Sequence, residues 1–487
     1  MNFNSLYFAI FFAIVFSLTA LLRNRVTPRN VVLLGASYLF YGWWDWRFLS
    51  LLWISTLFDY WCARVLDRRL EGRPEGPVTR PRSDKAFLIA SMALNLGFLG
   101  FFKYFNFFVD SAEASLALVG ITAHVPTLKV VLPVGISFYT FQSMSYVIDV
   151  YRGTMRAERS LLTFALYIAF FPQLVAGPIE RATTLVPQLR RPNVITLPRV
   201  YSGAYLIAWG LIKKVVIADN VAQVVNGAFA APDPSGGTAL LGIYAFAIQI
   251  YCDFSGYTDV ARGASRVMGF ELMRNFDLPY FATNPSDFWR RWHISLSTWL
   301  RDYVYIPLGG NRKSPARTYV NLMLTMLLGG LWHGAAWTFV LWGAFHGLML
   351  CVHRAAQPYL RRWVDPQGAF SRRAWYFLRA FLFFQLVCFG WLLFRASSLE
   401  QVGQMLAAIA QSAATIDPKV LGPGLLAVFA ACAGALLLVQ IVQFASRNHD
   451  VVWRLPVPVR AVLYAAGILA FVVFGEYGGD SFIYFQF

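Results

Sequence analysis

Two histidines in a mostly apolar and aromatic chain are the residues best suited to chemistry. His333 stands in the sequence GLWHG and His293 in WRRWHISLS, both within the stretch from Asn284 to His346. Titratable side chains are costly to place at membrane depth, so where they occur they usually mark a functional site. This stretch is therefore the candidate site, and the remaining apolar runs and basic loops form its frame.

The apolar run before His333, residues 319–332, is too short to cross a bilayer. As a helix it rises about 21 Å, less than the roughly 30 Å of hydrocarbon. If Arg317 marks the cytoplasmic surface, His333 lies inside the membrane, below the outer face. The small residues 334–336 (Gly-Ala-Ala) are expected to leave room for a substrate beside it. The alternative is a packing histidine that bonds a carbonyl of another helix.

His293 belongs to residues 258–317, a basic and aromatic region with no run apolar enough to span. Residues 287–305 are expected to form one amphipathic helix, capped by Ser286 or Asp287, that lies at or re-enters the membrane from the cytoplasmic face. Arginines among tryptophans are usually interface anchors. Alternatively, Arg290 and its basic neighbour receive an anionic donor such as a CoA phosphate.

A third polar cluster, IQIYCDFSGYTDVARG (residues 248–263), closes an apolar run. A buried Asp253 needs a partner. It could orient a histidine, pair with Arg290, or cap a helix end at Gly256. The candidate donor-binding or supporting residues are Asp253, Ser255, Asp287, Trp289, Arg290 and Trp332.

The other possible sites have simpler interpretations. His346 is expected to be a helix-packing histidine, and His124, His353 and His449 are expected to be solvated. No two histidines stand four residues apart with a carboxylate partner, so no metal site is expected. The five cysteines show no CxxC spacing and are interpreted as packing residues. No GxSxG, Walker, GxGxxG or HExxH motif occurs.

Composition identifies the chain as an all-α, multi-span membrane protein. The chain is 57% hydrophobic, 17% aromatic and only 14% charged over 487 residues, too apolar for a soluble protein of this size. Its net charge of +17 is explained by basic cytoplasmic loops, so no nucleic-acid partner is expected. A single transmembrane domain over residues 1–487 is predicted, with residues 258–317 as its re-entrant, cytoplasmic-side part.

The distribution of Lys and Arg among the loops predicts about twelve crossings, within a range of about 11–13, with both termini outside. The alternation holds if residues 161–177 enter and return on the cytoplasmic side, because Pro172, Gly177 and Pro178 break helical hydrogen bonding. Lys213 and Lys214, in the middle of an apolar run, are expected to snorkel toward the surface, or their helix to tilt.

Several segments resemble the membrane-bound O-acyltransferase family, most closely its bacterial branch for O-acetylation of alginate and related polymers. The matching segments are VLPVGISFYTFQSMSYVIDVYRG (131–153), FFPQLVAGPIER (170–181), IQIYCDFSGYTDVARG (248–263), NPSDFWRRWHISLSTWLRDYVYIPLGGNR (284–312), GLWHGAAWTFVLWGAFHG (330–347) and FIYFQF (482–487).

This resemblance implies a helical bundle with a central tunnel, in a bacterial inner membrane. It implies that acetyl-CoA enters from the cytoplasm, with no permanently bound cofactor. His333 matches the family's catalytic histidine, and His293 matches the second motif histidine. The acceptor would be a hydroxyl on an extracytoplasmic partner protein, which then acetylates an exopolysaccharide such as alginate. Cellulose and peptidoglycan are alternative final acceptors.

Two rival functions come from other classes. A transporter or flippase would suit broken helices and polar groups at the midplane, although no paired half-repeats are visible. A scaffold that recruits extracytoplasmic enzymes would be indifferent to changes at His333.

Overall fold

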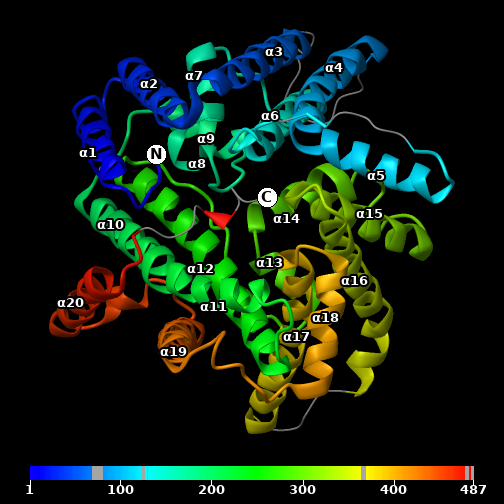
Figure 1. Cartoon of the computed structure of the whole chain (residues 1–487). Helices are drawn as coiled ribbons and strands as arrows, with labels where there is room; N and C mark the ends of the chain where they lie inside the picture. The colour runs from blue at the N-terminus through cyan, green and yellow to red at the C-terminus, as the bar shows by residue number, and fades with distance from the viewer. Residues whose placement is uncertain (69–80, 123–126, 129, 364–368, 478–481, 484–487) are drawn as a thin grey trace. The chain divides into compact units, whose positions relative to one another are not determined.

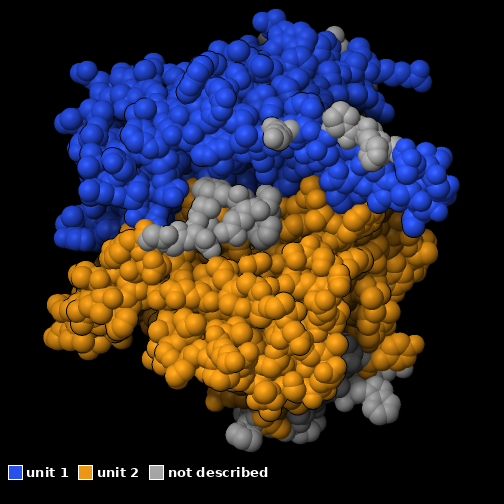
Figure 2. All heavy atoms as spheres, viewed as in Figure 1, with its two compact units in different colours: residues 1–207, 258–273 blue, residues 208–257, 274–487 orange. Residues whose placement is uncertain are grey.

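The computed structural model describes residues 1–68, 81–122, 127–128, 130–363, 369–477 and 482–483. Every regular secondary-structure element in these ranges is a helix (Figure 1), which confirms the predicted all-α class. The contacts divide the chain into two compact units, residues 1–207 with 258–273 and residues 208–257 with 274–487 (Figure 2).

The first unit holds the N-terminal helices. Its longer helices are α1 (Leu6–Leu21), α2 (Val26–Asp45), α3 (Leu49–Arg68), α4 (Arg82–Leu99), α5 (Phe105–Leu118), α6 (Ile136–Arg152), α7 (Leu161–Ala169), α9 (Ala182–Leu189) and most of α10 (Leu197–Leu211).

A carboxylate inside the first unit joins three of these helices. Asp59 of α3 is fully buried and accepts hydrogen bonds from the Ser91 hydroxyl at 2.6 Å and the Asn95 amide at 2.8 Å, both on α4. The Ser143 hydroxyl of α6 donates a third bond. Buried polar groups require such internal partners, so this cluster fixes how the three helices pack.

The predicted break in residues 161–177 is present. Helix α7 has 9 residues and ends at Ala169, and the 4-residue α8 (Phe171–Leu174) follows. At 1.5 Å per residue α7 rises only about 14 Å, well short of a bilayer. The broken backbone from Phe170 to Glu180 is buried in protein, as such backbone must be at membrane depth.

The second unit holds the predicted site. Its helices are α11 (Asp219–Ala230), most of α12 (Gly236–Val267), α13 (Pro285–Arg291), α14 (Ile294–Leu300), α15 (Pro315–His333), α16 (Trp337–Trp363), α17 (Ala369–Arg395), α18 (Leu399–Ser412), α19 (Pro423–Ser446) and α20 (Val457–Phe474).

Seven helical segments of the described chain are long and apolar enough to cross a membrane, by length and composition. The other helices at predicted spans, including α3 and α15, are shorter or carry more polar residues. Asp59 shows why: polar side chains there face inward and lower the mean hydropathy. The chain therefore has several membrane-spanning helices, and the count of about twelve crossings stays a prediction.

Three expected helix boundaries are wrong. Residues 287–305 do not form one helix, because α13 ends at Arg291 and α14 begins only at Ile294. The cap of α13 is Asn284, whose side chain accepts from the Asp287 amide at 2.9 Å, instead of Ser286 or Asp287. Helix α12 does not end at Gly256 but continues to Val267.

Helices α15 and α16 form the hairpin that carries His333, and they run side by side in Figure 1. Ser314 caps α15 by accepting from the Arg317 amide at 3.2 Å. A Cβ placed at Gly330 would lie 2.2 Å from the Phe339 carbonyl oxygen, and one at Gly343 would lie 2.5 Å from the Met326 carbonyl oxygen. Small residues that let backbones approach are typical of packed membrane helices.

We predict that Gly330→Ala destabilises the protein. The added methyl group overpacks the hairpin, which typically costs about 1–3 kcal/mol, although alanine is the better helix former. The matched control is Gly434→Ala in α19, where a Cβ meets nothing within 4 Å. Thermal unfolding in detergent should show a lower Tm for Gly330→Ala and an unchanged or higher Tm for Gly434→Ala. Equal Tm values for the two variants would contradict the close approach.

Candidate active site

His333 is the last residue of α15, and its side chain is 3% exposed. Aromatic rings surround it. The ring centroids of Trp332 and Trp342 both lie 5.0 Å away, and that of Phe394 lies 5.2 Å away. Helices α15, α16 and α17 thus each supply part of an aromatic wall around one imidazole.

The space expected beside Gly334 is filled. A Cβ at Gly334 would lie 2.1 Å from the ring of Phe339, and that ring packs edge-on against Phe394 at 4.9 Å. The expectation that small residues leave room at Gly334 is therefore wrong. The glycine is needed because an aromatic ring occupies the position where a side chain would stand.

His293 lies next to His333. Their ring centroids are 6.3 Å apart, and Trp332 contacts both rings, with its centroid 5.5 Å from that of His293. Phe254 of α12 packs edge-on against His293 at 4.7 Å. The structure therefore brings together the two predicted histidines and Trp332.

The backbone turns sharply at His293, which explains the break between α13 and α14. His293 has φ +43°, in the left-handed region, which side chains other than glycine rarely adopt. Asn275 holds this turn, because its carbonyl accepts from the Ile294 amide and its side chain accepts from the Ser295 amide, both at 3.0 Å.

His293 lies outside the seven candidate spans and is fully buried. Burial lowers the pKa of its imidazole from 6.5 to about 3, because desolvation disfavours the charged form. His293 is therefore neutral at physiological pH. It can donate or accept a hydrogen bond, but it does not bring a positive charge to the site.

The other predicted supporting residues differ in how close they lie to the two histidines. The ring centroid of Trp289 lies 5.7 Å from that of Trp342 and 5.2 Å from that of His346. Because Trp342 also packs on His333, Trp289 is linked to His333 through one intervening ring. Arg290 is exposed. Asp287 forms a partly exposed ion pair with Arg291 at 2.9 Å. Neither of these two charged side chains is recorded in contact with the histidines.

Asp253 and Ser255 are held by two consecutive lysines. The Lys213 ammonium donates to the Ser255 hydroxyl at 2.9 Å, and the Lys214 ammonium lies 3.0 Å from Asp253. Asp253 thus pairs with Lys214 in place of the expected Arg290. Lys213 is 3% exposed, so the expectation that the lysines snorkel is wrong. The π-helical turn η3 (Ile212–Ala218) directs both side chains inward.

The remaining histidines are not ligands of a common centre. His346 is 1% exposed and packs on Trp342 at 4.5 Å, as expected of a packing residue. His449 is not simply solvated, because its Nε2 lies 2.6 Å from Asp277 Oδ1. This hydrogen bond holds the pKa of Asp277 below its usual range. His353 is half-exposed, and His124 lies outside the described residues.

Among the described side chains, no three His, Cys, Asp or Glu residues are placed to hold a metal ion. All five cysteines are free, and Cys62, Cys252 and Cys388 are buried, which confirms their packing role. Sequence reasoning missed Trp342, Phe394 and the inward lysines. Trp342 does stand in the segment GLWHGAAWTFVLWGAFHG, but apolar packing residues carry no signal of their own.

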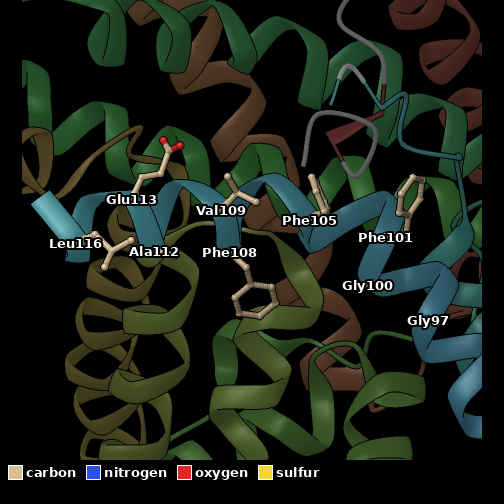
Figure 3. A pocket seen from close by; sticks show the side chains of 9 residues that line it. All are labelled: Gly97, Gly100, Phe101, Phe105, Phe108, Val109, Ala112, Glu113 and Leu116. Atoms are coloured by element: carbon tan, nitrogen blue, oxygen red, sulfur yellow. The ribbon is translucent and has the colours of Figure 1, made fainter. Parts of the chain in front are cut away.

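Two described cavities lie away from the histidines. The larger, about 600 Å³, belongs to the first unit and is lined by α4, α5 and the π-helical turn η2 (Gly100–Tyr104) between them (Figure 3). Glu113 is the one charged side chain among its lining residues. The smaller, about 260 Å³, is bordered by residues 229–232 and 397–404 of the second unit.

The chain is similar to a known family and to several bacterial proteins. The model of "MBOAT, membrane-bound O-acyltransferase family" matches residues 156–398, which include both histidines. The probable alginate O-acetylase AlgI of Azotobacter vinelandii is 47% identical over 381 residues, covering 78% of this chain and 72% of that protein. The Pseudomonas aeruginosa protein of the same name is 45% identical, covering 77% and 69%. The peptidoglycan O-acetyltransferase of Helicobacter pylori is 36% identical, covering 80% and 75%.

We predict that the turn at His293 inverts the usual ranking of alanine and glycine. His293→Gly should be more stable than His293→Ala by about 1–2 kcal/mol, because only glycine adopts the left-handed conformation without strain. At the buried, helical His346 the order should be the ordinary one, with alanine more stable by about 1 kcal/mol. Thermal unfolding of the four purified variants measures both differences. The same order at both positions would show that the turn is absent.

Proposed function

Since the chain belongs to the membrane-bound O-acyltransferase family and is an O-acyltransferase, we propose that it moves an acetyl group from cytoplasmic acetyl-CoA through the membrane. The acceptor is a hydroxyl on the other side, and the product serves O-acetylation of an exopolysaccharide such as alginate. The observation that carries the proposal is His333, a buried imidazole beside a second histidine, within the segment that matches the family.

In this proposal His333 is the general base. An alcohol is a poor nucleophile at neutral pH, so a base must take its proton as the oxygen attacks the thioester carbonyl carbon. The C–O bond forms, the C–S bond breaks, and His333 passes the proton to the departing sulfur of CoA. A neutral imidazole is suited to both transfers, because its reference pKa lies near 6.5.

The surrounding rings support this chemistry in two ways. Trp332, Trp342 and Phe394 keep water from the thioester, which limits hydrolysis. The indole N–H groups of Trp289 and Trp342 are buried and have no acceptor among the described residues. Such donors are available to the carbonyl oxygen as it becomes negative.

The route and the partners follow from the same proposal. Acetyl-CoA is the acyl donor, and no resident cofactor takes part. The acceptor hydroxyl belongs to an extracytoplasmic partner protein that hands the acetyl group to the polymer. The protein lies in a bacterial inner membrane with both termini outside, which the basic loops favour. The names of the relatives favour alginate over peptidoglycan as the polymer, because the alginate proteins are the more similar.

We predict that His333→Ala inserts normally but loses acetyl transfer. Removal of a general base typically lowers the rate by about 10²–10⁴-fold. His353→Ala, which changes a half-exposed histidine of α16, is the matched control and should transfer at the parent rate. Transfer of radiolabelled acetyl from acetyl-CoA to the acceptor in membrane vesicles measures the effect. Transfer by His333→Ala at the parent rate would falsify the assignment.

The side from which the donor enters can be tested separately. Inside-out vesicles expose the cytoplasmic face, and they should consume acetyl-CoA supplied in the medium. Sealed right-side-out vesicles should not do so until they are permeabilised, because CoA is charged and does not cross the bilayer. Equal rates in the two sealed preparations would rule out a cytoplasmic donor and leave the role of His333 standing.

A further inference from the structure

Lys214 and two aspartates form an ion-pair cluster inside the second unit. Lys214 lies 2.7 Å from Asp219 and 3.0 Å from Asp253. Both carboxylates are at most 5% exposed. Ion pairs this buried are costly to desolvate unless further hydrogen bonds satisfy them. The chemistry proposed above gives these side chains no role.

The cluster holds a segment from the far end of the chain. Asp253 Oδ2 accepts a hydrogen bond from the backbone amide of Ile483 at 2.7 Å, across 230 residues of sequence. Hydrogen bonds to a charged acceptor are the stronger kind. Ile483 is 3% exposed and Phe482 is 5% exposed. The C-terminal pair Phe482–Ile483 is therefore docked into the protein.

Phe482 continues this contact toward the histidines. Its ring stacks on Tyr257 at 4.6 Å and packs on Phe254 at 5.9 Å. Phe254 and Tyr257 are three residues apart on α12, so they share a face of that helix. Phe254 is also the residue that packs edge-on against His293 at 4.7 Å. The docked pair thus supports the ring that borders one of the two histidines.

We propose that Asp253 is a positioning residue that docks Phe482–Ile483 onto α12 and thereby fixes Phe254 against His293. Lys214 lies against one oxygen of the Asp253 carboxylate, and the other oxygen accepts from the Ile483 amide. The effect on acetyl transfer rests on the function proposed above, whereas the docking itself does not. Asp219 shares Lys214 with Asp253, so it offers a matched comparison.

The docking is tested by thiol accessibility in the full-length protein. Ile483→Cys keeps the backbone amide and should react slowly with a membrane-permeant maleimide, counted above the labelling of the parent's five cysteines. Adding Asp253→Ala should speed this labelling about tenfold or more, the equivalent of losing a hydrogen bond to a charged group. Adding Asp219→Ala should leave it slow. Equal acceleration by both substitutions, or by neither, overturns the proposal.

Transfer activity provides the second measurement. Asp253→Ala and Ile483→Pro, which removes the donating N–H, should each lower kcat about tenfold with little change in KM, and the double variant should be no slower than either. If the two losses of kcat multiply in the double variant, the positioning role is contradicted. It is also contradicted if a variant whose C-terminal pair is labelled quickly keeps full activity. Ile483→Pro leaves the ion pairs intact, so it serves if Asp253→Ala does not fold.

The two proposals fail in different ways. His333→Ala in the Ile483→Cys background should abolish transfer and keep the labelling slow. Retained transfer in that variant overturns the general base and leaves the docking in place. Fast labelling there would overturn the docking proposal, because the docking would then depend on His333.

Discussion

A polar group that this protein buries can be stabilised only by a partner within the protein, because lipid offers none. Asp59 is satisfied by hydroxyl and amide donors from two other helices. Lys214 is satisfied by two carboxylates. These contacts fix helices that apolar packing alone would leave free to slide, since lipid and leucine are equally apolar. The two histidines differ from these groups, because aromatic rings enclose their imidazoles.

The histidine site is built where helices end, not along their lengths. His333 closes α15, and His293 occupies the left-handed turn between α13 and α14. At such positions the backbone is free of the regular hydrogen-bond ladder, so a side chain can be aimed independently of helical periodicity. The cost is local strain and exposed backbone groups, and Asn275 satisfies two of those groups at His293. The rigid hairpin of α15 and α16 then holds the other side.

The sequence predicts the features that depend on local chemistry. The all-helical class and a broken helix within residues 161–177 were accessible from residue types and spacing, and the two histidines were accessible as site residues from their sequence context and the family resemblance. The failures involve partners that are distant in sequence. The apolar run around Lys213 and Lys214 predicts snorkelling, because no residue close in sequence indicates the pairing with Asp253 or the π-helical turn. The spacing of aromatics across 287–305 favours a continuous helix, because periodicity does not report a positive φ. Gly334 predicts open space beside it, but in the structure the ring of Phe339 fills that space.

The backbone contact within the hairpin limits how the site can diversify. With Gly330 and Gly343 already in contact with carbonyl oxygens of the opposite helix, α15 and α16 can move neither closer nor independently. A substitution that widens the wall around His333 would therefore have to fall on its aromatic rings, such as Phe394, because the glycine contacts fix the spacing of the hairpin.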